Sequence, residues 1–464
     1  MSYYVTLLRF TFKEGEVSFT GRMLETANYN KSVAAGKMVP TITIAHVAPN
    51  DWSMSEQMVG IMNFYDNTNV WTWKLGPEDK PDEGQYLAVT DWPQVHEVDP
   101  HTLAIKVCMR LFLIIARFNL LSPHILPHII QAKHGLSLTE GLSMASSTHW
   151  RREVGKDSSL QYHMIYNPLT NKIDFTLFRF GSTFEEREVV GKFPLPYVSV
   201  IHMFSVTENF AVIAVYPVSF DFMAMPTHNM HPFETLVKKD APTRFFLINL
   251  NDGSVIDGFE SDNPFLVFSA HHVNAWEEGS EVVLDLGCSP WDIFTTLFDM
   301  ETMMNQTLTD RDTADFVIKR VRLNIAEKSV SVEDWPNALG IPMLTTMEFP
   351  MINMEYSGRK NRYAYGWVSI DYWRTTLVKK DLENSLNDKM WSKDSHYPVE
   401  MFFVPRPGAK DEDDGVLMTV VFDGEQRRWY LLLLDGITFT ELDRSYLPFR
   451  VPFSFHGNWF PALH

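Results

Sequence analysis

Four histidines lie within or beside apolar stretches that are typical of β-strands. They are His163 in LQYHMIYNP, His202 in VSVIHMFSVTENF, His271 in LVFSAHHVNAWEEG and His456 in VPFSFHGNWF. Imidazole is a common ligand of transition metals, so these residues could build a metal site. Taken singly, each is more often a hydrogen-bonded core histidine, because spacing in sequence says nothing about closure in space. No H-E-x-x-H zinc motif occurs.

One carboxylate also stands in apolar surroundings. Glu348 lies in MEFPMIN, between Met347 and Phe349. Burying a carboxylate is costly unless a partner compensates it. From the residues alone, two partners are equally open: an imidazole, or a nearby cation, Arg359 or Arg362.

The composition is that of an ordinary globular protein, with 464 residues, 45% of them apolar and 21% charged. The net charge of −18 disfavours nucleic acid as a partner.

Two cysteines, Cys108 and Cys288, exclude a disulfide framework and a cysteine-rich zinc site. They fit a reducing compartment, so a cytoplasmic location is expected. At the N-terminus the apolar residues alternate with polar ones, and charged residues follow at once, whereas a signal peptide has a continuous apolar stretch.

Most of the chain is predicted to form short strands separated by turns. Residues 1–464 are expected to form one all-β domain. The sequence Asn251-Asp252-Gly253 predicts a hairpin, and two Asp-Gly pairs within 415–442 predict a β-meander. A β-propeller would limit the exposed strand edges of so large an antiparallel protein. The acidic run at 411–415 is expected to be a solvated turn.

Residues 103–160 depart from this pattern and are expected to form an atypical insertion or lid-like segment. Their apolar core, LFLIIARFNLL, is too short to span a bilayer, which takes about 20 apolar residues. We expect instead that residues 111–130 make a peripheral membrane contact.

Five stretches resemble the carotenoid cleavage oxygenases, the family of the animal β-carotene oxygenases and the retinoid isomerase of the retinal pigment epithelium. They are VIHMFSVTENFAV, AHHVNAWEEG, MEFPMINMEYSGRKNRYAYG, EDDGVLMTVVF and FSFHG. The resemblance covers the chain from near residue 5 to the C-terminus, outside residues 102–160. It implies an all-β, seven-bladed propeller with iron on the central axis and a helical or loop cap. Because relatives have a longer N-terminal region, the N-terminal blade is expected to be incomplete.

The resemblance implies that four histidines, one from each of four blades, bind Fe(II). Carried over by motif, they are His163, His202, His271 and His456. His163 departs from the Ala-His pattern of the family. His271 is preferred over His272 because Asn274, Trp276 and Glu277 complete the family pattern after it, and His272 should point to the other face of its strand.

The resemblance also implies three carboxylates that fix the second N–H of the metal-bound imidazoles. The matching residues are Glu348, Glu400 in YPVEMFFV and Asp91 in VTDWPQ. Asp91 stands where the family has glutamate, so its reach is one methylene shorter.

The function implied by the resemblance is that of a Fe(II)-dependent dioxygenase, an oxidoreductase. Molecular oxygen would cleave a double bond of a carotenoid or apocarotenoid, such as β-carotene, into aldehydes such as retinal. Two alternatives stay open: a retinoid isomerase-type reaction, and non-catalytic binding of a carotenoid or lipid on the same scaffold.

Overall fold

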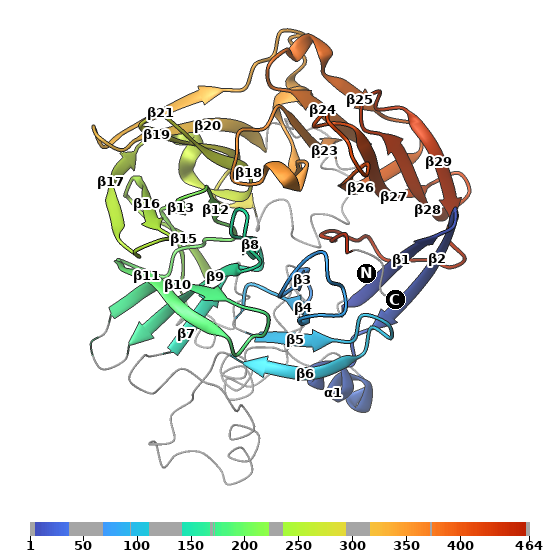
Figure 1. Cartoon of the computed structure of the whole chain (residues 1–464), viewed down its shortest axis with the longest axis horizontal. Coiled ribbons are helices and arrows are strands. Elements are labelled where there is room, and N and C mark those ends of the chain that lie inside the picture. The colour runs from blue at the N-terminus through green and yellow to red at the C-terminus, as the bar shows by residue number, and fades with distance from the viewer. Residues whose placement is uncertain are drawn as a thin grey trace.

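Antiparallel sheets arranged around a common centre make up the described part of the chain (Figure 1). The computed structural model describes residues 5–36, 68–92, 94–110, 142–167, 170, 172–221, 235–293, 316–371 and 374–460. Within these residues, six sheets contain four or five strands each, and two sheets are two-stranded. The prediction of an all-β propeller is confirmed.

The six larger sheets are the blades, and each is named by its strands. The first blade consists of β3 (Trp71–Lys74), β4 (Tyr86–Val89), β5 (Gln94–Val98) and β6 (Ile105–Arg110). The second consists of β7 (Leu142–Ser146), β8 (Arg151–Arg152), β9 (Ser159–Asn167), β10 (Lys172–Phe180) and β11 (Arg187–Leu195). The third consists of β12 (Ser205–Val206), β13 (Phe210–Val215), β16 (Thr243–Asn249) and β17 (Val255–Ser261).

The remaining three blades follow in chain order. The fourth consists of β18 (Ser269–Glu278), β19 (Glu281–Cys288), β20 (Val317–Asn324) and β21 (Ser329–Asp334). The fifth consists of β22 (Glu348–Met351), β23 (Tyr363–Asp371), β24 (Arg374–Asp381) and β25 (Lys389–Trp391). The sixth consists of β26 (His396–Pro405), β27 (Gly415–Asp423), β28 (Arg428–Asp435) and β29 (Glu441–Tyr446). The first strands β3, β12, β18 and β26 lie nearest the centre of the ring within their blades, and in the second blade β8 lies nearer the centre than β9, β10 and β11 (Figure 1).

Smaller elements connect or flank the blades. The two-stranded sheets are β1 (Thr6–Lys13) with β2 (Glu16–Met23), and β14 (Val218–Phe220) with β15 (Leu236–Lys238). The described helices are α1 (Ala27–Ala35) and the short 3₁₀ segments η2 (Pro264–Val267), η3 (Pro342–Thr345), η4 (Met354–Tyr356) and η5 (Ser385–Asn387). None of the helices in the described ranges has the length and apolar character needed to cross a membrane.

The hairpin β1–β2 takes a place of its own in the ring, between the last blade and the first (Figure 1). On one side, Leu8, Phe10 and Phe19 pack against Val399 and Val420 of the last blade. On the other side, Val5, Leu7 and Leu24 pack against residues of β4 and β5 in the first blade. Five further apolar clusters fill the junctions between successive blades. The hairpin therefore occupies the seventh position of the ring.

The predicted turns connect the strands as expected. The turn through Asn251-Asp252-Gly253 joins β16 to β17, and Gly253 has φ +73°. A Cβ atom on Gly253 would lie 2.1 Å from the carbonyl oxygen of Val190, so only glycine fits there. The two Asp-Gly pairs join β27, β28 and β29, which form the predicted meander.

The range 103–160 contains regular blade strands at both of its ends. β6 lies at its start, and β7, β8 and the first residues of β9 lie at its end. Residues 111–141, which include the segment expected to touch a membrane, lie outside the described residues.

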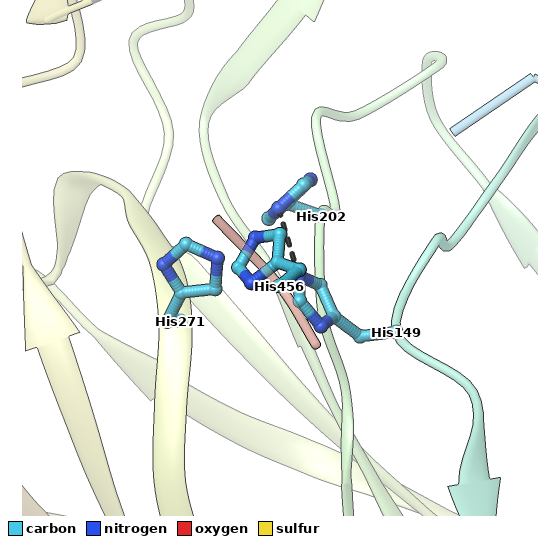
Figure 2. A group of neighbouring side chains, drawn as sticks. All are labelled: His149, His202, His271 and His456. Atoms are coloured by element: carbon cyan, nitrogen blue, oxygen red, sulfur yellow. Dashed lines mark hydrogen bonds between the residues drawn. The ribbon is translucent and has the colours of Figure 1, made fainter. Parts of the chain in front are cut away.

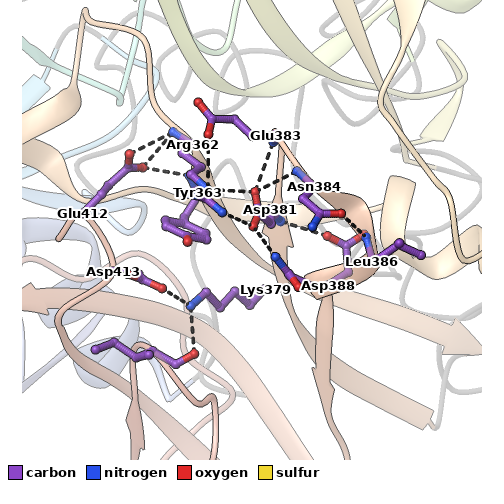
Figure 3. Close-up of polar contacts among 12 residues, drawn as sticks. Arg362, Tyr363, Lys379, Asp381, Glu383, Asn384, Leu386, Asp388, Glu412 and Asp413 are labelled. Carbon is purple, nitrogen blue, oxygen red and sulfur yellow. Dashed lines mark hydrogen bonds and ion pairs between the residues drawn. The ribbon is translucent and has the colours of Figure 1, made fainter.

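A buried polar seam crosses the junction between the blades β22–β25 and β26–β29 (Figure 3). Lys379 Nζ lies 2.5 Å from Asp413 Oδ2 and 2.6 Å from the carbonyl oxygen of Gly436. The Glu412 carboxylate accepts the backbone N–H groups of Arg362 and Tyr363 at 2.8–3.0 Å. The expectation that 411–415 is a solvated turn is therefore wrong for Glu412 and Asp413, because their charges join two blades.

Replacing the buried cation of this seam tests its contribution to stability. Lys379→Met leaves the Asp413 carboxylate without its ammonium partner, so the free energy of unfolding should fall by about 3–5 kcal/mol in urea denaturation. Lys80 and Glu83 form an exposed pair, with side chains 54% and 58% accessible. Lys80→Met should change stability by less than about 1 kcal/mol. Equal losses in the two variants would show that the seam contributes no more than a surface pair.

Candidate metal centre

Four imidazoles meet near the centre of the ring, and their potential ligand atoms lie within 4.8 Å of one another. They belong to His149, His202, His271 and His456 (Figure 2). His149 lies between β7 and β8, His202 precedes β12, His271 lies on β18, and His456 lies in the segment after β29. The chain thus delivers one imidazole from each of four separate regions.

The surroundings keep at least two of these imidazoles neutral. Burial, together with the neighbouring His456 and His202, lowers the pKa of His149 well below its usual value. Burial and the same two neighbours do the same to the pKa of His271. A neutral imidazole offers a free lone pair, which is the form that binds a metal ion.

His202 pairs with a carboxylate from another blade. Its Nδ1 lies 3.0 Å and 3.1 Å from the two carboxylate oxygens of Asp91, in the turn between β4 and β5. Burial lowers the pKa of His202, but the charge and hydrogen bond of Asp91 outweigh it, so the net shift is upward. The shorter side chain of Asp91 therefore reaches the imidazole in spite of the missing methylene.

Two glutamates on innermost strands pair with two further histidines. Glu348, the first residue of β22, accepts a short hydrogen bond from Nδ1 of His271. Burial raises the pKa of Glu348 to about 7, although the N–H of Phe349 counteracts this. Glu400 on β26 contacts Nδ1 of His456 at 3.2 Å and also accepts the backbone N–H of His456.

The salt-bridge alternative for Glu348 is not what the structure contains. Arg359 pairs with Glu208, with Nε 3.0 Å from Oε1. Arg362 pairs with Asp381, with Nη2 2.8 Å from Oδ2. The partner of Glu348 is therefore the imidazole of His271.

His149 is the member of the group that the sequence analysis missed. Among the described residues no carboxylate pairs with its ring, whose Nε2 lies 3.1 Å from Nε2 of His202 (Figure 2). Its backbone N–H donates to the hydroxyl of Ser147 at 2.9 Å. The adjacent N–H of Thr148 donates to Oδ1 of Asp91 at 3.1 Å. The loop of His149 is thus held by hydrogen bonds from its backbone N–H groups to the side-chain oxygens of Ser147 and Asp91.

The structure places His163 outside this group, so His149 replaces it as the fourth member. His163 lies on β9, which β7 and β8 flank on the side of the ring centre. Its Nδ1 lies 2.8 Å from the hydroxyl of Ser143, and its ring packs on Phe178. Burial and the charge of Arg187 lower the pKa of His163 to about 3. His163 is thus a neutral core histidine, the alternative that spacing could not exclude.

The structure separates the adjacent histidines of β18. The ring of His271 joins the group, whereas that of His272 contacts Ser205 Oγ at 2.8 Å and the hydroxyl of Tyr216 at 3.3 Å. Side chains of successive strand residues point to opposite faces, which explains the separation.

The dimensions of the group fit one transition-metal ion. Metal–nitrogen bonds of about 2.1 Å put opposite ligands about 4.2 Å apart, close to the observed upper limit of 4.8 Å between ligand atoms. His271 Nε2 is buried and has no hydrogen-bond partner among the described residues. A buried nitrogen without a partner is costly, and a metal ion would satisfy it.

Aromatic rings pack against the histidines of the group. Phe349 packs against His271 and His456, with ring centroids 5.5 Å and 5.3 Å apart. Phe455 stacks on Phe349, and Trp71 packs against His149 at 4.9 Å. The rings of Trp71, Phe349 and Phe455 thus form an aromatic wall beside the histidines.

Comparisons with known proteins agree with this architecture. A family model described as retinal pigment epithelial membrane protein matches residues 5–461. The β,β-carotene 15,15′-dioxygenase of Rattus norvegicus is 26% identical over 509 residues, covering 97% of this chain and 81% of the relative. The enzyme of the same name from Gallus gallus is 27% identical over 496 residues, covering 97% and 87%. The carotenoid isomerooxygenase of Galleria mellonella is 26% identical over 485 residues, covering 98% and 85%.

A solved structure has a similar fold. A single-residue variant of the apocarotenoid oxygenase from Synechocystis aligns with a TM-score of 0.75 and 20% sequence identity. The alignment covers 98% of this chain and 86% of that one. The described part of the chain therefore shares the fold of that enzyme.

Removing single histidines distinguishes the two candidates for the fourth position. His149→Ala should lose nearly all bound metal, because one ligand of the group is missing. His163→Ala should keep the metal content of the wild type and lose only stability, because its ring lies in the core. Metal content is measured by atomic spectroscopy on samples with matched circular dichroism. Metal loss in His163→Ala alone would contradict this assignment.

Removing one carboxylate tests how the rings are held. Glu348→Ala leaves Nδ1 of His271 without its acceptor, and metal affinity should fall about 10- to 100-fold. The control is Glu208→Ala, since the side chain of Glu208 is 58% exposed and pairs with Arg359. Titration with Fe(II) or Co(II) measures both affinities, and equal affinities would refute a role for Glu348.

Proposed function

Because the chain belongs to the retinal pigment epithelial membrane protein family of carotenoid cleavage oxygenases, we propose that it is a Fe(II)-dependent dioxygenase. Its substrate is a carotenoid or apocarotenoid resembling β-carotene, and its products are aldehydes such as retinal. The observation that carries the proposal is the group of four imidazoles, from two buried and two half-buried histidines, three of which pair with carboxylates. The residues of the metal site are His149, His202, His271 and His456.

Fe(II) suits the ligand set. Imidazole nitrogen is a good ligand for iron, and four neutral ligands leave the charge of the ion undiminished and coordination positions open. When bound, iron would supply the activation of dioxygen, whose two oxygen atoms end in two carbonyl groups as one carbon–carbon double bond breaks.

The carboxylates prepare the imidazoles for this role. Asp91, Glu348 and Glu400 each accept a hydrogen bond at the Nδ1 position of one histidine. A proton held at Nδ1 leaves the lone pair on Nε2, so the ring is fixed in the tautomer and orientation that bind metal. Their negative charges also stabilise a cation in a buried centre.

The aromatic wall supports an apolar, extended substrate. The rings of Trp71, Phe349 and Phe455 offer flat surfaces beside the histidines. A polyene has no polar group to anchor it, so packing on such surfaces would orient the double bond and exclude water. The rat and chicken relatives are named for β,β-carotene, which makes it the first substrate to test.

Iron content and product analysis test the proposal together. The purified chain should contain stoichiometric iron and convert β-carotene in detergent, under air, into aldehydes with uptake of dioxygen. His202→Ala should lose both iron and activity. The control is His396→Ala, since His396 is buried outside the group and contacts the hydroxyl of Tyr430 at 2.9 Å.

Each alternative function gives a different result in the same samples. Isomerisation of a retinyl ester without uptake of dioxygen would favour the isomerase-type reaction. Bound pigment without turnover would favour a binding protein. A folded chain that takes up no iron would overturn the metal centre itself.

A further inference from the structure

One serine hydroxyl joins the backbones of two of the four histidines across a blade junction. Ser147 Oγ donates to the carbonyl oxygen of His202 at 2.7 Å and accepts the backbone N–H of His149 at 2.9 Å. Ser147 lies between β7 and β8, whereas His202 lies before β12 of the neighbouring blade. The single hydroxyl therefore fixes the distance between two chain segments that lie far apart in sequence.

The serine itself is held firmly. Ser147 is 0% exposed, so water does not compete for its hydroxyl. Its carbonyl oxygen accepts a short hydrogen bond from Nε2 of Gln161 on β9. Oε1 of Gln161 in turn accepts the N–H of Tyr162 at 2.8 Å. The regular strand β9 thus anchors Ser147, although Ser147 lies outside any strand.

The imidazoles of His149 and His202 are the pair that this bridge controls. Their Nε2 atoms lie 3.1 Å apart (Figure 2). Asp91 fixes the ring of His202, but in the described part of the chain no carboxylate pairs with the ring of His149. The position of His149 therefore depends on its backbone, and Ser147 relates that backbone directly to His202.

We propose that Ser147 is a positioning residue of the metal centre, which sets the separation of the His149 and His202 nitrogens. The proposal rests on the proposed function, because it assumes that these histidines bind one metal ion. Small displacements of ligands change metal affinity and coordination geometry, so loss of the bridge should affect both.

The test is a titration of the metal-free chain with Co(II), whose visible absorption reports its coordination geometry. Ser147→Ala should bind Co(II) about 10- to 100-fold more weakly than the wild type, with an altered spectrum. The control is Ser143→Ala. Ser143 is also buried, lies in the same blade and contacts a histidine, His163, at 2.8 Å. It should leave affinity and spectrum unchanged.

A second variant, Ser147→Cys, keeps the test decisive when Ser147→Ala does not fold. Ser147→Cys keeps a similar volume and a weak S–H donor, so it should give an intermediate affinity. A folded Ser147 variant with the affinity and spectrum of the wild type would overturn the proposal. So would equal losses in Ser143→Ala, or failure of both Ser147 variants to fold while Ser143→Ala folds.

Metal binding by the wild-type chain separates a failure of this inference from a failure of the proposed function. If the wild type binds no Co(II) or Fe(II), the metal centre is refuted and the positioning role falls with it. If the wild type binds metal and Ser147→Ala binds it equally well, only the positioning role is refuted.

Discussion

Closure of the ring is the constraint on which the centre depends. The four imidazoles come from four separate regions of the chain, and they meet only because every blade packs on its two neighbours. Apolar clusters fill each junction, including both sides of the hairpin β1–β2. Because packed interiors deform little, a rigid ring can hold ligands from different blades at fixed distances.

Removal of the imidazoles from water creates an electrostatic requirement that the carboxylates meet. Burial disfavours the charged form of His149 and His271, so these imidazoles are neutral in the folded chain. The same burial raises the pKa of Glu348 to about 7, which shows the cost of placing an anion there. A cation at the centre would lower that cost, because it attracts the carboxylate while it binds the imidazole. The acids and the histidines are therefore complementary as a set, around a positive charge.

The sequence pattern predicted the strands, and the family resemblance named three of the four histidines that the structure brings together and the three carboxylates that contact them. Their role in binding metal stays a prediction. His202 and His271 lie in long motifs of the family and His456 lies in the short motif FSFHG, and the resemblance predicted all three. The prediction of His163 as the fourth histidine is wrong because it took an apolar, strand-like sequence context as the common feature of the ligands. His163 has that setting, but it lies on β9, which β7 and β8 flank on the side of the ring centre. His149 stands among small polar residues in an interruption of the innermost strand, and periodicity cannot reveal which strand is innermost.

The interruption of the innermost strand also explains why some histidines of the centre are held through their rings and others through their backbones. A histidine on a strand, such as His271, has its backbone fixed by the sheet, so a carboxylate on its ring completes its orientation. A histidine in a loop needs its backbone fixed first. His149 and His202 both lie in loops, and the hydroxyl of Ser147 bonds to the backbone of each. A buried hydroxyl can serve two loops at once because it donates one hydrogen bond and accepts another. The hydroxyl of Ser147 and the carboxylates of Asp91, Glu348 and Glu400 therefore contact the four histidines where their positions need to be fixed, so the centre includes these groups as well as the imidazoles.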